Sequence, residues 1–290
     1  MAQVCTAGVD TGFEALGPVK SAFLGVVQGI TELMPISSTA HMRIVPALLG
    51  WRDPGSAYSA AMQLAALAAV LTYFWRDIAQ LAGGSVNALA RRRFDDHDLR
   101  LSLWIGLATI PIVAAGVALG KLLNTCGSPL RGVAVIGWAC VGMAVLLALA
   151  ELLARHTRKM GQVTLFDALA VGVAQAGALI PGVSRSGSTL TAALALGFNR
   201  EDAARFSFLL GIPAIALAGG REIWELHKAH LPAYGWEVLG VGLAVASVSA
   251  FVAIWGLMRI LERFSAWPFV VYRGVLGVVL LAGSAMGKIS

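Results

Sequence analysis

Charged residues are scarce in this chain of 290 residues, since Asp, Glu, Lys and Arg make up 13% of it against 58% hydrophobic residues. The mean hydropathy is +0.76. So few charges exclude an ordinary soluble domain and a disordered chain. A net charge of +6 would suggest a nucleic-acid partner in a soluble protein, but we expect none here, because the positive residues gather in loops between apolar segments. The sequence therefore predicts an all-α integral membrane protein.

Cysteine is equally rare. Cys5, Cys126 and Cys140 show neither CxxC nor metal-ligand spacing, so we assign them no redox or metal role. A cleavable signal peptide is not indicated, since residues 1–17 lack a basic start and contain Asp10 and Glu14. We expect residues 1–17 to be an N-terminal extension and residues 18–290 a single polytopic membrane domain, whose internal helices drive insertion.

What the chain has in abundance is long apolar segments. Uncharged windows cover residues 54–75, 101–120, 132–150 and 238–258, each near the roughly 20 residues that a helix needs to cross a bilayer. Two further segments, 206–220 and 268–287, are less clearly transmembrane, and the second contains Arg273. Arginine at a helix end can extend its charged group to the lipid headgroups, so we expect no buried charge there. The sequence predicts about six transmembrane helices.

Two other apolar regions are broken by proline. Residues 19–34 and 38–49 are separated by Pro35, which removes a backbone donor and disfavours helix at the residue before it. Residues 166–180 and 186–198 repeat this layout around Pro181 and Gly182. Apolar pieces of about 10 to 15 residues are typical of re-entrant segments. We therefore expect two re-entrant helical hairpins, at residues 19–49 and 166–198.

The two hairpins also resemble each other in sequence. GVVQ at 25–28 aligns with GVAQ at 172–175, and with one gap Pro35 aligns with Pro181, each followed by serines. Chance similarity between segments rich in Gly, Ala and Val is the alternative. Hairpins that enter from opposite sides would bring their broken helices together near the bilayer midplane, where the exposed helix ends build a site. The pattern predicts an inverted-topology repeat.

Positive loop residues are divided unevenly between the two sides of the predicted membrane domain. One side has Lys121, Arg131, Arg221 and Lys228, and the other has twelve: Arg76, Arg91, Arg92, Arg93, Arg100, Arg155, Arg158, Lys159, Arg200, Arg205, Arg259 and Arg263. Positive residues in short loops mark the cytoplasmic side. We therefore expect both termini on the opposite side. The arginines at 91–93 and the acidic residues after them indicate a solvated loop and a helix start.

The hairpin breaks carry the most suggestive chemistry. A helix that begins inside a membrane exposes unpaired N–H groups and a positive dipole end, which suits phosphate. Hydroxyl groups gather at both such starts: Ser37, Ser38 and Thr39 in the first hairpin, and Ser184, Ser186, Ser188 and Thr189 in the second. Capping of the helix accounts for one hydroxyl at each start and leaves the others as candidate phosphate ligands.

Other polar residues accompany these hydroxyls. Arg185 can hold phosphate with two hydrogen bonds, or it can pair with Glu32. His41 follows Ser38 by three residues, so both project from one helix face within reach of a proton transfer. Gln28 and Glu32 lie four residues apart on the facing helix, and Glu32 can bind a divalent cation or transfer protons. Together these groups predict a phosphoryl-transfer site.

The segments QGITELMPISSTAHM (28–42) and PGVSRSGST (181–189) resemble the two signature motifs of the undecaprenyl-diphosphate phosphatases of the bacitracin-resistance type. The similarity extends to MQLAALAAV (62–70), FSFLLGIP (206–213) and WPFVVYR (267–273). It implies a bacterial inner-membrane hydrolase that converts undecaprenyl diphosphate to undecaprenyl phosphate and inorganic phosphate, recycling the carrier lipid for peptidoglycan synthesis. It also implies inverted repeats with two re-entrant hairpins and a site open to the periplasm, the side on which the loop charges place both termini.

The resemblance assigns roles to single residues. Ser38 matches the proposed nucleophile, His41 its acid/base partner, and Glu32 the carboxylate linked to metal and activity. The phosphate-binding residues of the second motif correspond to Ser184, Arg185 and Thr189, to which the hydroxyl pattern adds Ser37, Thr39 and Ser186. Attack by Ser38 and direct attack by water both remain open.

A divalent cation, Mg²⁺ or Ca²⁺, is expected near Glu32. Gln28 stands where a glutamate is common in the family, and a neutral amide is a weaker metal ligand than a carboxylate. A metal site with two carboxylates is therefore in doubt, and Gln28 is the second candidate ligand.

Two other classes of protein compete with this interpretation. A lipid or anion transporter, or a flippase, can use the same inverted-repeat cavity. A lipid phosphatase of the acid-phosphatase-like class needs the pattern SRxxxxxH, but the next histidine after Arg185 is His227. The expected partners are a polyprenyl diphosphate and membrane lipids. A homodimer stays open, because the lipid-facing surfaces show no clear motif.

Overall fold

The structure is a computed structural model that describes residues 5–6, 9–124, 130 and 132–287, with side chains described for 11–119, 130 and 132–287. Several residues of the sequence argument lie outside the described side chains: Cys5, Asp10, Lys121, Cys126 and Arg131. Among those described, Cys140 is a buried free thiol.

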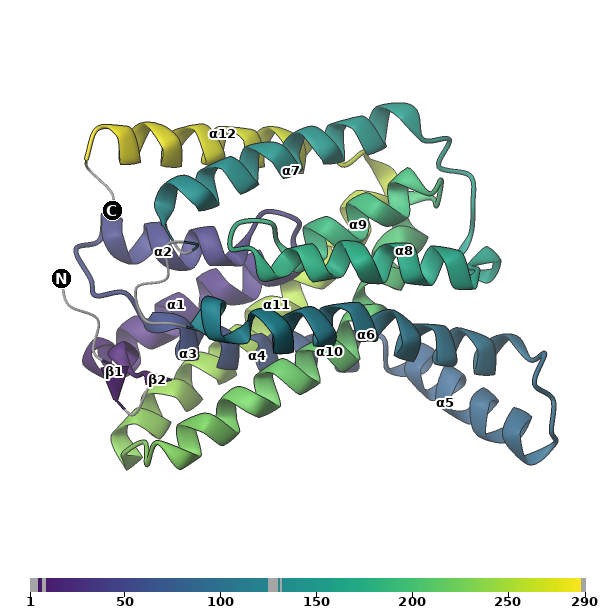
Figure 1. Cartoon of the computed structure of the whole chain (residues 1–290), viewed down its shortest axis with the longest axis horizontal. Coiled ribbons are helices and arrows are strands. Elements are labelled where there is room, and N and C mark those ends of the chain that lie inside the picture. The colour runs from purple at the N-terminus through teal and green to yellow at the C-terminus, as the bar shows by residue number, and fades with distance from the viewer. Residues whose placement is uncertain (1–4, 7–8, 125–129, 131, 288–290) are drawn as a thin grey trace.

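Within the described residues, six helical segments are long and apolar enough to cross a membrane, which confirms the predicted number. They are α3 (Gly55–Ala61) joined through Met62 to α4 (Gln63–Tyr73), α6 (His97–Asn124), α7 (Val133–Leu153), α10 (Arg200–Lys228), α11 (Ala233–Arg263) and α12 (Trp267–Ala285). Each contains one of the predicted windows or its greater part. The long helices run roughly along one axis, so the chain forms an elongated bundle (Figure 1).

One long helix was not predicted. Helix α5 (Trp75–Ala90) follows α4 with only Phe74 between them and ends at the arginines of 91–93. It packs against α6, where Ser85 Oγ donates to Ser102 Oγ at 2.9 Å. Short elements outside the hairpins include β1 (Cys5–Thr6), β2 (Val9–Asp10), η1 (Gly12–Leu16) and η3 (Met160–Gln162). Phe13 of η1 is fully buried, so the segment before the first hairpin joins the core.

Both predicted hairpins form as helix, break and helix. The first consists of α1 (Gly17–Leu33) and α2 (Ser38–Leu48), and the second of α8 (Leu165–Ala176), η4 (Gly177–Leu179) and α9 (Arg185–Ala195). A capping box between Thr164 and Asp167 starts α8. In Figure 1, α1 and α2 occupy the left part of the bundle, whereas α8 and α9 extend to the right, so the two breaks approach each other from opposite ends.

The two hairpins, which resemble each other in sequence, also pack against long helices in the same way. An added Cβ at Gly25 would lie 2.6 Å from Gly242 O of α11, and one at Gly172 would lie 2.3 Å from Ala108 O of α6. Each glycine therefore lets its hairpin press against the backbone of a long helix. The second helices also start alike, because Ser37 (φ 72°) and Ser184 (φ 66°) cap them in a backbone region that few residues other than glycine adopt.

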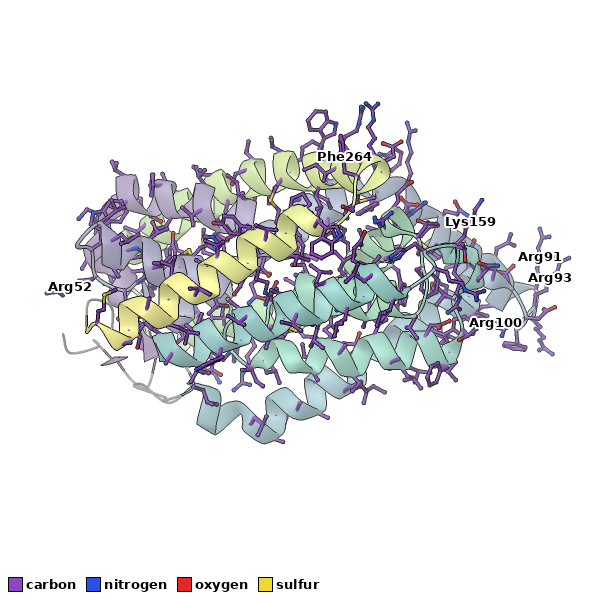
Figure 2. The ribbon with its side chains drawn as sticks, turned by 90° about the horizontal axis from the view of Figure 1, so that it is seen from above. Arg52, Arg91, Arg93, Arg100, Lys159 and Phe264 are labelled. Atoms are coloured by element: carbon purple, nitrogen blue, oxygen red, sulfur yellow. The ribbon has the colours of Figure 1, made fainter. Side chains whose placement is uncertain are left out.

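Four residues of the larger positive set lie together in the structure. Arg91, Arg93, Arg100 and Lys159 gather at one end of the molecule, and Arg52 projects from the other (Figure 2). Strands β1 and β2 and the last turn of α12 lie at the end opposite the arginine cluster (Figure 1). Both ends of the described chain are therefore on the same side.

Arg273 overturns one expectation. It lies inside α12 with 1% of its surface exposed, so its guanidinium is buried and does not extend to the lipid headgroups. Nη1 donates to Pro35 O at 3.2 Å, and Nη2 donates to Gly182 O at 2.6 Å and to Val183 O. Breaks in a helix leave carbonyl groups without helical partners, and a buried charge is tolerated where such groups satisfy it. Arg273 thus ties the two hairpin breaks together.

Replacing this guanidinium is expected to destabilise the bundle. Arg273→Met would leave buried carbonyls without a donor, at about 1–3 kcal/mol for each unsatisfied group. We expect the Tm in detergent to fall by about 5 °C or more. Arg263→Met, at the exposed end of α11, removes the same charge as a control and should leave the Tm unchanged. An unaltered Tm for Arg273→Met would show that the hydrogen bonds of Arg273 contribute nothing to the stability of the bundle.

Candidate active site

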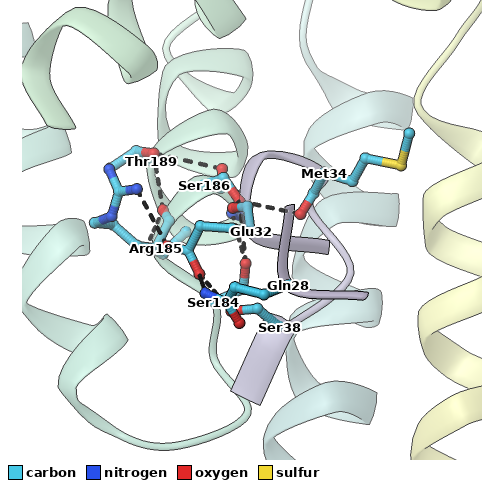
Figure 3. Close-up of polar contacts among 10 residues, drawn as sticks. Gln28, Glu32, Met34, Ser38, Ser184, Arg185, Ser186 and Thr189 are labelled. Carbon is cyan, nitrogen blue, oxygen red and sulfur yellow. Dashed lines mark hydrogen bonds and ion pairs between the residues drawn. The ribbon is translucent and has the colours of Figure 1, made fainter. Parts of the chain in front are cut away.

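Glu32 is the centre of the polar contacts between the hairpins (Figure 3). It lies in the last turn of α1, and 6% of its surface is exposed. Ser38 Oγ donates to Glu32 Oε2 at 2.5 Å, and Gln28 Nε2 donates to the same oxygen at 3.0 Å. Arg185 Nη2 donates to Glu32 Oε1 at 3.3 Å. A buried carboxylate needs such partners, so the site forms around one negative charge with a serine hydroxyl directly on it.

Arg185 is positioned by the helix behind it. An added Cβ at Gly211 of α10 would lie 2.0 Å from Arg185 Nη1, so the guanidinium occupies space that any other residue at 211 would fill. Both interpretations left open by the sequence can apply to Arg185, since it pairs with Glu32 and lies at the N-terminus of α9, where an anion is favoured.

The hydroxyls at the breaks divide into two groups. Some hold the backbone: Ser37 Oγ accepts from Ala40 N, Ser186 Oγ donates to Glu32 O at 3.0 Å, and Thr189 Oγ1 donates to Arg185 O at 2.9 Å. These three residues are buried and do not line the cavity described below. Ser38 and Thr39 do line it, and Ser184 caps α9 in a half-buried position. Of the predicted phosphate ligands, Thr39 lines the cavity, whereas Ser184 and Arg185 are half-buried at the N-terminus of α9 and do not.

His41 has different partners from those predicted. Its Nδ1 lies 2.8 Å from Ser37 O, and its Nε2 lies 2.6 Å from the hydroxyl of Tyr272. The two rings are nearly parallel, with centroids 5.7 Å apart. Because a carbonyl only accepts, the neutral ring carries its proton on Nδ1, and Nε2 accepts from Tyr272. Neither ring nitrogen is paired with Ser38. The imidazole instead links the backbone at Ser37 to Tyr272 of α12.

A cavity of about 570 Å³ opens beside Ser38. Gln28, Glu32, Ser38 and Thr39 line it from the first hairpin. The wall from α6 is wholly apolar, and the wall from α3 and α4 includes Ser56, Ser59 and Gln63. A pocket with one apolar wall and one polar wall suits an amphipathic ligand that has a lipid tail and a charged headgroup.

The residues present fit a divalent cation bound together with a phosphorylated ligand. Gln28 Oε1 is buried without a hydrogen-bond partner, and Nε2 of the same amide donates to the carboxylate of Glu32. Among the residues that the structure describes, no three His, Cys, Asp or Glu side chains are grouped for a metal. Mg²⁺ often takes only one or two protein ligands and fills its other positions with water and phosphate oxygens. Glu32 and Gln28 Oε1 are a donor set of that kind.

Comparison with known proteins agrees with these motifs. The family described as "Bacitracin resistance protein BacA" matches residues 21–279. The chain belongs to this family. The protein named "Undecaprenyl-diphosphatase 2" from Mesorhizobium japonicum is 73% identical over 261 residues, covering 90% of this chain and 99% of its own. Undecaprenyl-diphosphatases of Gloeobacter violaceus and Trichormus variabilis are 49% and 45% identical over 94% and 96% of this chain, and over 94% and 88% of their own.

Two residues of this BacA-family site were missed in the sequence. Tyr272 and Arg273 are adjacent on α12, and they reach His41 and Pro35, whose positions are 231 and 238 residues away in the chain. The available signal was the charge itself, because an arginine within an apolar segment is expensive unless it is paired.

The contacts of His41 allow a test of its role. His41→Asn retains an N–H group that can donate to Ser37 O, so a positioning role predicts turnover within about tenfold of wild type and an unchanged pH profile. His41→Ala should lose about a hundredfold or more, and Tyr272→Phe only a few-fold. The measurement is phosphate release across pH by each purified variant. If Asn and Ala substitutions were equally damaging and flattened one limb of the pH profile, His41 would act as an acid or base.

Proposed function

We propose that Ser38, Glu32 and Arg185 carry out the hydrolysis of undecaprenyl diphosphate to undecaprenyl phosphate and inorganic phosphate. The chain is an undecaprenyl-diphosphatase of the BacA family and a multi-pass membrane protein. The observation that carries the assignment of roles is the 2.5 Å hydrogen bond from Ser38 to Glu32, with Arg185 on the other carboxylate oxygen. A nucleophile and a base thus meet at one end of an amphipathic cavity, and a cation is paired with the base.

The first step is attack by Ser38 on the terminal phosphorus. As the Ser38 oxygen bonds to phosphorus, its proton passes to Glu32, to which it is already hydrogen-bonded. The bond from phosphorus to the bridging oxygen breaks, and its electron pair leaves with undecaprenyl phosphate. Arg185 and the N-termini of α2 and α9 stabilise the charge on the phosphoryl oxygens.

The second step restores the enzyme. Water attacks the phosphoserine, the Ser38 oxygen leaves and takes back the proton from Glu32, and inorganic phosphate is released. Direct attack of water on the diphosphate, with Ser38 and Glu32 orienting it, is the alternative route. When bound, a divalent cation held by Glu32 and Gln28 Oε1 would offset phosphate charge.

The cavity belongs to the half of the bundle away from the arginine cluster. Its lining comes from the start of α3 and the later parts of α6 and α10, and α10 ends at Lys228. Positive loops mark the cytoplasmic side, so we place the cavity mouth and both termini in the periplasm of a bacterial inner membrane. The hairpins then re-enter the membrane from opposite faces and meet near its midplane.

Transport is not favoured over hydrolysis. An inverted repeat serves transporters as well, but a flippase has no need of a serine hydroxyl on a buried carboxylate. Exposed apolar side chains on α7 and α12, such as Trp138, Leu146 and Val275, contact membrane lipids or, in a homodimer, a second copy.

Trapping the intermediate tests the covalent route. Rapid quench of the purified enzyme with substrate labelled on the terminal phosphate should give labelled protein, and peptide mapping should place the label on Ser38. Ser38→Ala should abolish the label and lower turnover by about a thousandfold or more. Fast turnover without labelled protein would instead support direct attack by water.

The cation site can be tested through Gln28. After treatment with EDTA, turnover should fall and return on addition of Mg²⁺ or Ca²⁺. Gln28→Glu adds a second carboxylate, and we expect it to lower the Mg²⁺ concentration for half-maximal turnover by about tenfold. Gln63→Glu adds the same charge on another cavity wall as a control. Full activity in EDTA, with no response to Mg²⁺ in either variant, would exclude the site.

A further inference from the structure

The cavity has a second polar region, which the proposed chemistry does not use. Arg221 and Glu222 line it from α10, together with Ala214, Leu217 and Ala218. These residues recur at helical spacing, so they form one stripe of α10 that faces the cavity. The neighbouring face of α10 packs against α4, since an added Cβ at Gly219 would lie 2.5 Å from the side chain of Leu64.

Arg221 lies at the open end of this stripe. Its side chain is exposed, whereas Ala214, seven residues earlier, is buried. Arg221 is also the only cation among the lining residues that the structure describes, since Arg185 lies behind Glu32 and does not line the cavity. An anionic headgroup in this part of the cavity therefore has Arg221 as its cationic partner.

The spacing along α10 separates Arg221 from the reacting groups. Gly211 contacts the guanidinium of Arg185, and Arg221 follows ten residues later, which is about 15 Å along a helix. A separation of this size places the backbone of Arg221 well away from the guanidinium of Arg185. Arg221 can therefore act before or after the reaction, but not on the phosphoryl group while it is transferred.

We propose that Arg221 forms an entry site for phosphate groups at the mouth of the cavity, distinct from the reaction site at Ser38. It binds the diphosphate headgroup of the incoming lipid, or the phosphate that leaves, and Glu222 beside it weakens binding of the same anions. This inference rests on the proposed function for the identity of the lipid, but not for the existence of the anion site.

Kinetics distinguish an entry site from a catalytic one. Arg221→Gln should raise the KM for undecaprenyl diphosphate by about three- to tenfold with kcat within twofold of wild type, because an entry site assists capture of the lipid and takes no part in the steps that follow. Arg221→Lys keeps the charge and should restore most of the affinity. Glu222→Gln removes a negative charge and should lower the KM. The effect of Arg221 should shrink at high salt.

Lys228→Gln is the matched control, since Lys228 is an exposed cation at the end of the same helix that does not line the cavity. It should leave the KM unchanged. Inhibition by inorganic phosphate then separates the two ligand sources. Weaker inhibition of Arg221→Gln indicates that the site also binds the released phosphate, whereas unchanged inhibition with a raised KM restricts it to the lipid headgroup.

Binding without turnover makes the test independent of the proposed function. A prenyl methylenediphosphonate, in which CH₂ replaces the bridging oxygen, is measured for Kd against the purified full chain. A weaker Kd for Arg221→Gln, with Lys228→Gln at wild-type affinity, supports the site even if the wild type released no phosphate. Equal Kd values for Arg221→Gln and wild type, or equal losses in both variants, would overturn it.

Discussion

Two helix breaks inside an apolar chain leave carbonyl groups that no helix satisfies, and the fold depends on a buried guanidinium that reaches them. Arg273 bonds to Pro35 O in the first break and to Gly182 O and Val183 O in the second. Water cannot replace these contacts in a membrane interior. The charge of Arg273 is balanced by the same carbonyl dipoles, so neither the breaks nor the arginine would be stable alone.

Most of the fold was predictable because apolar length and proline placement are local properties of the sequence. The six long helices and both hairpins appear where uncharged windows and Pro35 indicated them. Helix α5 was missed because only Phe74 separates it from α4, with no Gly or Pro to mark a new element. The burial of Arg273 depends on carbonyls far away in the chain, which periodicity does not report.

The site was predictable in its members but not in its pairings. Residue types and spacing predicted Glu32, Ser38 and Arg185 as site residues, and in the structure Ser38 and Arg185 both contact Glu32. Spacing on one helix favoured a pair between Ser38 and His41, yet the ring of His41 turns to Tyr272 of another helix. Three-residue spacing gives a shared face, but side-chain direction is decided by partners from the rest of the bundle.

Gly211 shows how a missing side chain can set the chemistry of a remote residue. Because Gly211 carries only a hydrogen atom in place of a side chain, α10 has room for Arg185 Nη1 at this point. Helix α10 therefore determines how deeply the guanidinium lies behind Glu32. A methyl group there would push the guanidinium toward the cavity and loosen its hold on the carboxylate. The Ser38–Glu32 hydrogen bond and the affinity of the α9 N-terminus for anions are therefore linked through Arg185, and a substitution at position 211 would alter both.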